Sequence, residues 1–287
     1  MHETNPDFDP DDSRLDSTEP AQSLVPRFRD HLAPGRPFTV FKDRITGCTR
    51  TLKPRALAVD VDGTITENGG TLNLDAVSAL RWMEKLGVKV VLASGRGAWE
   101  MYALAVYAGT TRVIVGENGG VVAVSPVDVA MLSDKAASLE AYEVLSRELG
   151  DLQIRPVIPR FTEVILERTF DLEKAREILR RHDLPVTIND SKYAYHLTKL
   201  GVDKATGLRA ALSYLNIPPT DTVAIGDSET DIPMFELCGY SIALANAPQS
   251  SKNRANYVSE FGMGRGLVDA VQHVVDSFLR TTITEGN

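Results

Sequence analysis

The sequence has few cysteines, no long apolar run and no excess of basic residues. Its 287 residues include 2 cysteines, Cys48 and Cys238, which are far apart and lack metal-ligand spacing, so neither a disulfide framework nor a zinc site is indicated. No stretch approaches the roughly 20 apolar residues that a membrane span needs. With 31 basic against 39 acidic residues and a net charge of −8, the composition speaks against nucleic-acid binding.

The composition that remains is typical of a globular protein. Hydrophobic residues make up 43% of the chain, enough for a core in one large or two ordinary domains. The first residues lack the basic and apolar regions of a signal peptide, so we expect a cytoplasmic protein. Residues 1–20 are rich in Asp, Pro, Ser and Thr, which is typical of disorder. We therefore expect residues 1–54 to form a partly disordered extension, with a short helix and a strand pair after residue 20, that packs on the main domain or forms a dimer.

From residue 55, short apolar runs alternate with segments of helical periodicity, which predicts an α/β fold. A strand is predicted at 56–61, a helix at 75–86 and a second strand at 88–93. Strand, helix and strand in this order form a βαβ unit, which indicates a parallel sheet with a right-handed crossover. A predicted helix at 99–108 and a strand at 113–115 continue the pattern.

The alternation changes between residues 122 and 199. Here the sequence predicts a strand near 122, helices at 135–149 and 172–182, and strands at 162–167, 186–188 and 194–197. We expect this α+β segment to be a separate small domain inserted into a Rossmann-like, doubly wound parallel sheet, whose two parts are residues 55–121 and 200–287. The second part is predicted to contain helices at 203–215, 233–237 and 268–279, and strands at 222–225 and 241–244.

Two carboxylates, Asp60 and Asp62, end the strand predicted at 56–61, and a turn follows at Gly63. Side chains at i and i+2 of an extended segment point the same way, so these carboxylates are expected to converge at the C-terminal edge of the sheet. Open α/β sheets bind ligands at that edge. Like charges held so close need a cation between them or a proton on one of them. The pair therefore indicates a metal site or split protonation states, and a solvated Asp-rich turn is the alternative.

Three further polar groups follow, or lie near, predicted strands. Ser94 follows the strand at 88–93, Lys204 begins a helix, and Asp227 and Asp231 follow the strand at 222–225. With the first pair they supply a nucleophile and an acid, a hydroxyl, a cation and two more acids. This set suits phosphoryl transfer from a monoester through a carboxylate nucleophile, with a hard dication held by oxygens. Each group alone is also explained by a turn, a solvated helix lysine or a helix N-terminus.

The four clusters resemble, in order and setting, the four motifs of the haloacid dehalogenase superfamily of phosphatases: DVDGT at 60–64, SGR at 94–96, Lys204 within VDKATGL, and GDSETD at 226–231. The inserted segment is similar to that superfamily's C2-type cap. Further stretches resemble the archaeal-type phosphoglycolate phosphatases, with the sucrose-phosphate phosphatases as a neighbouring group: VDVDGT, GENGG, Arg160, Tyr195-His196-Leu197 and GDSETDIPMF. The similarity covers about residues 55–280.

The resemblance implies roles for individual residues. Asp60 would attack phosphorus and become a transient aspartyl phosphate, and Asp62 would protonate the leaving oxygen and later deprotonate the attacking water. Ser94 and Gly95 would bind phosphate oxygens, while Lys204 would neutralise them and orient Asp60.

The resemblance also implies a magnesium ion as cofactor. Its expected ligands are Asp60, Asp62 through the backbone carbonyl region, Asp227 and, in or next to the coordination shell, Asp231.

Other residues have weaker signals. Asn118, in the GENGG stretch, is expected to line the site or to belong to a turn that ends a strand. Arg160 and His196 are expected to contact a substrate carboxylate or hydroxyl, and the alternatives are a surface arginine and a strand histidine with satisfied hydrogen bonds. The glycine-rich stretch at 262–266 lacks a strand before it and predicts a flexible loop near the site entrance.

The resemblance implies that the substrate is a small phosphorylated metabolite, with 2-phosphoglycolate favoured. A sugar-phosphate phosphatase, a phosphomutase and a non-catalytic binding protein on the same fold are the alternatives. We expect a monomer or a homodimer.

Overall fold

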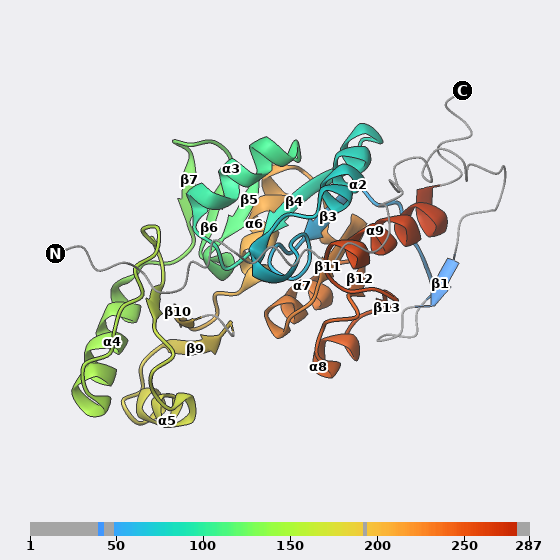
Figure 1. Cartoon of the computed structure of the whole chain (residues 1–287). Helices are drawn as coiled ribbons and strands as arrows, with labels where there is room; N and C mark the ends of the chain where they lie inside the picture. Colours follow the sequence, from blue (N-terminus) through green and yellow to red (C-terminus); the bar gives the residue numbers. More distant parts are fainter. Residues whose placement is uncertain (1–39, 43–48, 192–193, 280–287) are drawn as a thin grey trace, which may run out of the picture.

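The computed structural model describes residues 40–42, 49–191 and 194–279 (Figure 1). Near its N-terminal end, β1 (Val40–Lys42) and β2 (Thr49–Thr51) pair antiparallel, with Val40 opposite Thr51. This pair confirms the strand pair expected after residue 20. Residues 1–39 and 43–48 of the expected extension lie outside the described part.

An eight-stranded sheet forms the centre of the molecule, in the order β13-β12-β11-β3-β4-β5-β6-β7. Neighbouring strands from β13 to β5 pair parallel, whereas β6 and β7 pair antiparallel. The predicted Rossmann-like parallel sheet is confirmed. The strands are β3 (Ala56–Val59), β4 (Lys89–Ala93), β5 (Ile114–Gly116), β6 (Val121–Ala123), β7 (Val129–Met131), β11 (Thr222–Gly226), β12 (Tyr240–Ala243) and β13 (Tyr257–Val258).

The strand expected near residue 122 belongs to this central sheet and not to the inserted segment. In β6, Ala123 lies opposite Ile114 of β5, and both side chains are buried. A short connection keeps consecutive strands adjacent, and this explains why β6 turns back onto β5 and β7 onto β6. The strands of the inserted segment therefore begin after Met131, not at residue 122.

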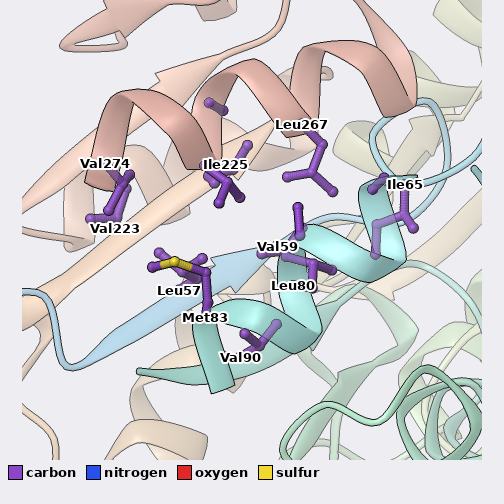
Figure 2. Close-up of a cluster of buried hydrophobic side chains, with 14 of the residues drawn as sticks. Leu57, Val59, Ile65, Leu80, Met83, Val90, Val223, Ile225, Leu267 and Val274 are labelled. Atoms are coloured by element: carbon purple, nitrogen blue, oxygen red, sulfur yellow. The ribbon is translucent and has the colours of Figure 1, made fainter. Parts of the chain in front are cut away.

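Helices cover both faces of the central sheet. On one face, α2 (Leu74–Lys85), α3 (Ala98–Ala108) and α9 (Met263–Val274) contribute to one buried cluster. Figure 2 shows Leu57 and Val59 of β3 together with Leu80 of α2 and Leu267 of α9 in this cluster. Burial of these large apolar residues stabilises the packing of the helices on this face of the sheet.

The opposite face of the sheet carries smaller residues, among them Ala56, Ala58 and Ala224. They let α6 (Lys204–Tyr214) and α7 (Ile232–Leu237) pack close to the strands. In α6 the approach is so close that a Cβ added at Gly207 would lie 2.4 Å from Val115 Cγ1. The small side chains on this face thus determine how deep α6 sits, and with it Lys204 at the start of the helix.

Helix α9 begins inside the glycine-rich stretch at 262–266, so the predicted flexible loop is wrong. Gly264 lies against Asn73, the residue that caps α2, and a Cβ added at Gly264 would lie 2.1 Å from Asn73 Cβ. The glycine is there because two helices approach closely, and the stretch is ordered by that packing. A π-helical turn at Val275–Leu279 continues α9.

The inserted segment between β7 and α6 contains a second, three-stranded antiparallel sheet in the order β8-β10-β9. Its strands are β8 (Val164–Leu166), β9 (Val186–Asp190) and β10 (Tyr195–Lys199), and its helices are α4 (Ala136–Leu149) and α5 (Leu172–Arg181). Figure 1 shows both helices on the outer side of this sheet, away from the central sheet. We call the inserted segment, from the end of β7 to the start of α6, the cap.

The alternation of side chains along β10 decides which residues face the site. Tyr195 and Leu197 pack with α4 and α5 in the buried cluster of the cap. Because successive side chains of a strand point to opposite faces, His196 and Thr198 point away from those helices.

The remaining elements are short: η1 (Asn68–Gly70), η2 (Glu117–Gly119), η3 (Pro219–Asp221), η4 (Glu229–Asp231) and α8 (Gln249–Lys252). Within the described part of the chain, no helix has the length and apolar character that crossing a membrane requires.

Candidate active site

The segments that follow β3, β4, β5 and β11 meet at one edge of the central sheet, because these strands are parallel. A cavity of about 500 Å³ opens there, between this edge and the cap. From the core it is lined by Asp60, Asp62, Ser94, Gly95, Asn118, Lys204, Asp227, Ser228, Glu229, Thr230 and Pro248, and from the cap by Asn189, Asp190, Ser191 and His196. Most of the site residues expected from the sequence therefore share one cavity; Asp231 and Arg160 lie behind its lining.

Lys204 joins two of the expected carboxylates. Its ammonium donates hydrogen bonds of 2.6 Å to Asp60 Oδ1 and 2.6 Å to Asp231 Oδ1. All three residues are buried. A buried ion pair of this kind needs good geometry and further hydrogen bonds to offset the loss of solvation. Here the loop after β11 supplies them, because the Asp227 and Ser228 amides and the Ser228 hydroxyl all donate to Asp231 Oδ2.

Local capping and close packing place Lys204 at this point. Asp203 caps α6 by accepting a hydrogen bond of 2.8 Å from the Thr206 amide. The helix start is pressed against η2, since a Cβ added at Gly119 would lie 1.7 Å from the carbonyl oxygen of Asp203. Gly119 also has φ of +100°, a conformation that favours glycine. The GENGG stretch thus seats the first turn of α6.

A third carboxylate, Asp227, completes an acidic cluster. Thr64 donates to Asp227 Oδ1 at 2.9 Å, and the Asn246 side-chain amide donates to Asp227 Oδ2 at 2.8 Å. One carboxylate oxygen from each of Asp60, Asp227 and Asp231 lies within 4.8 Å of the others. With one ammonium among three carboxylates, the ionised cluster has an excess of negative charge that a metal dication would offset.

The charges in this cluster shift the protonation of its members. Burial, then the neighbouring Asp231 carboxylate, raises the pKa of Asp60 well above its ordinary value, against the opposing effect of Lys204. Burial and Asp231 likewise raise the pKa of Asp227. Burial lowers the pKa of Lys204, but Asp231 and Asp60 together outweigh burial and leave this pKa above its usual range. Lys204 is therefore a fixed positive charge.

The donor set fits a metal ion held mainly by Asp60 and Asp227. Asp60 and Asp227 line the cavity, whereas Asp231 lies behind its lining, with Oδ1 held by Lys204 and Oδ2 by three donors of the loop after β11. Asp60 Oδ2, by contrast, has one long contact of 3.4 Å with the Thr64 hydroxyl. Carboxylate oxygens with free lone pairs are what hard dications bind. In this arrangement Asp231 orients Lys204 and the loop rather than the ion.

The Asp62 carboxylate lies apart from the acidic cluster. Arg96 donates to it from two nitrogens, with Nη2 2.6 Å from Oδ1 and Nε 2.9 Å from Oδ2. The expectation that Asp60 and Asp62 converge assumed an extended backbone through both residues. Strand β3 ends at Val59, and the Thr64 and Ile65 amides both donate to the Val61 carbonyl in a turn. Asp62 is therefore not one of the acids of the cluster, although it lines the same cavity as Asp60.

The turn after β4 brings Ser94 and Gly95 to the same cavity. The Ser94 amide donates to the Val115 carbonyl at 3.0 Å, and its hydroxyl accepts a hydrogen bond of 3.2 Å from the Arg96 amide. Gly95 lies against Asn118, since an added Cβ would be 3.0 Å from Asn118 Oδ1. These contacts hold the serine hydroxyl and a side chain-free backbone at the cavity wall.

The cap contributes His196, which is held by a buried glutamate. His196 Nδ1 lies 3.0 Å from Glu163 Oε2, and Nε2 lies 3.1 Å from the Ser191 hydroxyl. An ionised Glu163 accepts hydrogen bonds, so Nδ1 is the nitrogen that donates to it. Asn118 Nδ2 also donates to Glu163 Oε2, at 3.4 Å. Arg160 does not reach the cavity: its Nη1 donates to the Gly95 carbonyl at 2.6 Å and to Glu163 at 3.2 Å.

Comparison with known families agrees with this geometry. The profile of the family described as haloacid dehalogenase-like hydrolase matches residues 57–169 and 154–271. The chain is a haloacid dehalogenase-like hydrolase. Its four motifs, which lie at separate strand ends and at a helix start, are the segments that build the cavity.

Individual relatives of this haloacid dehalogenase-like hydrolase carry a more specific name. A phosphoglycolate phosphatase of Nitrosopumilus maritimus is 40% identical over 221 residues, which are 77% of this chain and 96% of the relative. A phosphoglycolate phosphatase of Methanoculleus marisnigri is 37% identical over 223 residues, 76% of this chain and 95% of the relative. A crystal structure of a Thermoplasma acidophilum protein superposes with a TM-score of 0.69 at 25% identity, covering 77% of this chain and 98% of that one.

The sequence does not show the roles of several residues near the site. Arg96 belongs to the quoted SGR motif, but nothing in the sequence shows that it binds Asp62. Thr64 lies within DVDGT, and its contact with Asp227 spans 163 residues. Glu163 is one acid in a predicted strand, and no sequence signal distinguishes it from a solvated one. All of these contacts depend on tertiary structure rather than on spacing.

Proposed function

We propose that this protein is a Mg²⁺-dependent phosphomonoester hydrolase that converts 2-phosphoglycolate to glycolate and phosphate. The observation that carries the proposal is the buried Lys204 ammonium, shared by Asp60 and Asp231 at the wall of a cavity that Ser94 and Asp227 also line. The substrate is taken from the relatives named phosphoglycolate phosphatase, of which the chain covers 95% or more.

Asp60 is the proposed nucleophile. Lys204 orients its carboxylate through Oδ1, and one of the two carboxylate oxygens attacks phosphorus while the other would bind the metal ion. A bond forms between Asp60 and phosphorus as the bond from phosphorus to the glycolate oxygen breaks, and the departing oxygen takes a proton from Asp62. Asp62 then accepts a proton from water, whose oxygen attacks phosphorus as the bond between phosphorus and Asp60 breaks, and inorganic phosphate is released. The step restores both carboxyl groups.

Other groups of the site hold the phosphoryl oxygens. We assign this role to the Ser94 hydroxyl, the Gly95 amide and Lys204, because a fixed ammonium and preorganised donors are most effective where charge develops in a buried site. A magnesium ion held by Asp60 and Asp227 would supply further neutralisation of phosphoryl charge. In the proposed magnesium site the backbone carbonyl of Asp62 would be a further ligand. The Asp231 carboxylate would lie next to the coordination shell of the ion.

Arg96 gives Asp62 a position distinct from that of Asp60. The bidentate pair holds the Asp62 carboxylate outside the acidic cluster while keeping it at the cavity wall. Asp60 can then face phosphorus while Asp62 faces the leaving oxygen. The carboxylate paired with Arg96 is a proton acceptor, which suits its role toward water; to protonate the leaving oxygen, Asp62 must first take up a proton and release Arg96.

The substrate carboxylate is proposed to meet the cap. His196 and Asn118 line the cavity side by side, and the partner of His196 Nε2, the Ser191 hydroxyl, lines it as well. Arg160 was expected to bind the substrate directly, but its guanidinium is used by Gly95 and Glu163. We therefore assign substrate contact to His196 and Asn118, and an indirect role to Arg160.

A sugar phosphate is the second candidate substrate, because the cavity of about 500 Å³ has more room than a two-carbon acid fills. Phosphate release with Mg²⁺ from 2-phosphoglycolate, 2-hydroxyethyl phosphate, glucose 6-phosphate and sucrose 6-phosphate separates the possibilities. The proposal expects the highest kcat/KM for 2-phosphoglycolate and a clear loss for the hydroxyethyl ester, which lacks the carboxylate. Equal or better turnover of a sugar phosphate would contradict the substrate assignment.

A further inference from the structure

Glu117 is a buried core carboxylate that the proposed reaction does not use. The Phe161 amide donates to both of its oxygens at 3.0 Å, and the Thr162 amide and hydroxyl donate to Oε2 at 2.8 Å each. The Glu117 side chain is fully buried, and burial raises its pKa against the opposing effect of these hydrogen bonds. All four contacts come from the cap. A buried carboxylate is costly without such donors, so the core is built to receive this loop.

The backbone around Glu117 supports the same conclusion. Glu117 and Asn118 have φ of +51° and +52°, a left-handed conformation that costs free energy at non-glycine residues. Next to them, Gly120 leaves room for the loop: a Cβ added there would lie 2.1 Å from the Thr162 hydroxyl oxygen. The left-handed turn at Glu117 and Asn118 and the absence of a side chain at Gly120 both allow the contact with Thr162.

The same loop reaches the phosphate-binding turn from the other side. Arg160 Nη1 donates to the Gly95 carbonyl at 2.6 Å, and its side chain is 9% exposed. At the end of the loop, Glu163 holds His196 and accepts from Asn118. Three residues of the cavity wall, Gly95, His196 and Asn118, are therefore held by this loop. Arg160 and Glu163, which hold them, do not line the cavity themselves.

We propose that residues 160–163, the anchor loop, fix the cap onto the phosphate-binding turn, and that Glu117 is the receptor for this loop. Glu117 and Arg160 are then positioning residues: they act on the substrate through Gly95 and His196. This inference rests on the proposed function in one respect: it takes Ser94 and Gly95 to be the residues that bind the phosphate of the substrate.

Glu117→Gln tests the anchor, and Glu84→Gln is a matched control. Glu84 also accepts backbone hydrogen bonds in the core, from the Val90 amide at 2.8 Å and the Thr111 amide at 2.6 Å, but it does not touch the cap. In Glu117→Gln an NH₂ group replaces an oxygen that accepts from an N–H donor in either orientation of the amide, because both carboxylate oxygens accept. In Glu84→Gln the carbonyl oxygen can keep the donors, which all bond to Oε1, so this variant controls for the loss of a carboxylate charge in the core. Both variants are expected to lose thermal stability, so stability alone does not decide the question.

Two readouts separate the variants. In Glu117→Gln, hydrogen exchange of the Phe161 and Thr162 amides should accelerate by about tenfold or more, since a hydrogen bond to a charged group is lost. The inhibition constant of inorganic phosphate and the KM for substrate should rise about tenfold, with a smaller change in kcat, because the phosphate-binding turn loses its support. Glu84→Gln should leave all of these values near those of the wild type. Arg160→Met, which keeps much of the apolar stem, should reproduce the phosphate effect if Glu117→Gln fails to fold.

The outcomes also separate the anchor from the proposed function. Unchanged exchange at Phe161 and Thr162 in Glu117→Gln would overturn the anchor, as would a phosphate inhibition constant that moves no further than in Glu84→Gln. A wild-type protein that hydrolyses sugar phosphates but not 2-phosphoglycolate would overturn the substrate. The exchange and phosphate measurements would still decide the anchor, because neither uses 2-phosphoglycolate.

Discussion

Replacing Lys204 by methionine tests how the site is held together. The substitution keeps much of the apolar stem and removes an ammonium that is 2.6 Å from both Asp60 and Asp231. The side chain is 3% exposed, so little water can replace the lost charge. Removing one partner of a buried ion pair costs about 3–5 kcal/mol, because the remaining charge stays buried and unpaired. For a protein of this size that loss lowers Tm by about 6–20 °C.

The stability that Lys204→Met loses should depend on pH. Burial and the neighbouring acids raise the pKa of Asp60 above its ordinary 3.8 in the folded protein. The unfolded chain then releases this proton at lower pH than the folded protein does. Stability from this group is therefore present below about pH 4 and is lost as the pH rises through the folded pKa. Lys204 lowers the pKa of Asp60, so its removal should raise that pKa further. The loss of stability between low and high pH should therefore be larger in Lys204→Met than in the wild type.

Denaturation of metal-free protein at pH 5 and pH 8, followed by circular dichroism, measures this effect. The deficit of Lys204→Met should be larger at pH 8, and Mg²⁺ should recover part of it, because an ion that binds the folded cluster stabilises it. Lys199→Met is the control, since Lys199 makes an exposed ion pair with Asp134 and should stay near wild type. A Lys204→Met midpoint equal to that of the control at pH 8 would refute the reasoning.

Three further predictions follow from the site. Asp62→Asn should lower kcat by about 100-fold or more while phosphate still inhibits, because proton transfer is lost and binding is not; steady-state kinetics with phosphate as inhibitor measures both. Chelation should abolish turnover, added Mg²⁺ should restore it, and Asp227→Asn should raise the Mg²⁺ concentration for half activity about tenfold or more in a titration. Gly207→Ala should cost about 1–3 kcal/mol in urea denaturation, because a Cβ there would lie 2.4 Å from Val115 Cγ1.

Each of these predictions has a result that opposes it. Full turnover by Asp62→Asn would remove Asp62 as the proton carrier. Activity that survives complete chelation would contradict the metal requirement, and an unchanged Mg²⁺ titration in Asp227→Asn would move the ligand set elsewhere. Wild-type stability of Gly207→Ala would show that α6 can shift away from β5 without cost.

The sequence predicts the central sheet and its functional edge well. Short buried runs such as 56–59 and 222–226 have no surface to expose on either face, so their pattern indicates parallel strands. Once those strands are parallel, their C-terminal ends must meet, which brings Asp60, Ser94 and Asp227 into one cavity. Helix boundaries such as Leu74–Lys85 also follow from local caps and periodicity.

What the sequence does not predict is set by contacts between distant segments. The pairing of β6 with β5 depends on a turn-back that hydrophobicity does not encode, and the order of 262–266 depends on the approach of Gly264 to Asn73. In the same way, the orientation of Asp62 depends on Arg96, 34 residues away. The role of Arg160 changes from substrate contact to support because the fold places Gly95 within its reach.

Hydrolysis of 2-phosphoglycolate by Asp60→Asn is the most direct test of the central claim. Asparagine has nearly the same shape as aspartate, so circular dichroism should show a folded protein while the nucleophilic oxygen is lost. With Mg²⁺ present, phosphate release should fall by about a thousandfold or more, as expected when a covalent nucleophile is removed. A folded Asp60→Asn protein that releases phosphate at the wild-type rate would contradict the aspartyl-phosphate mechanism.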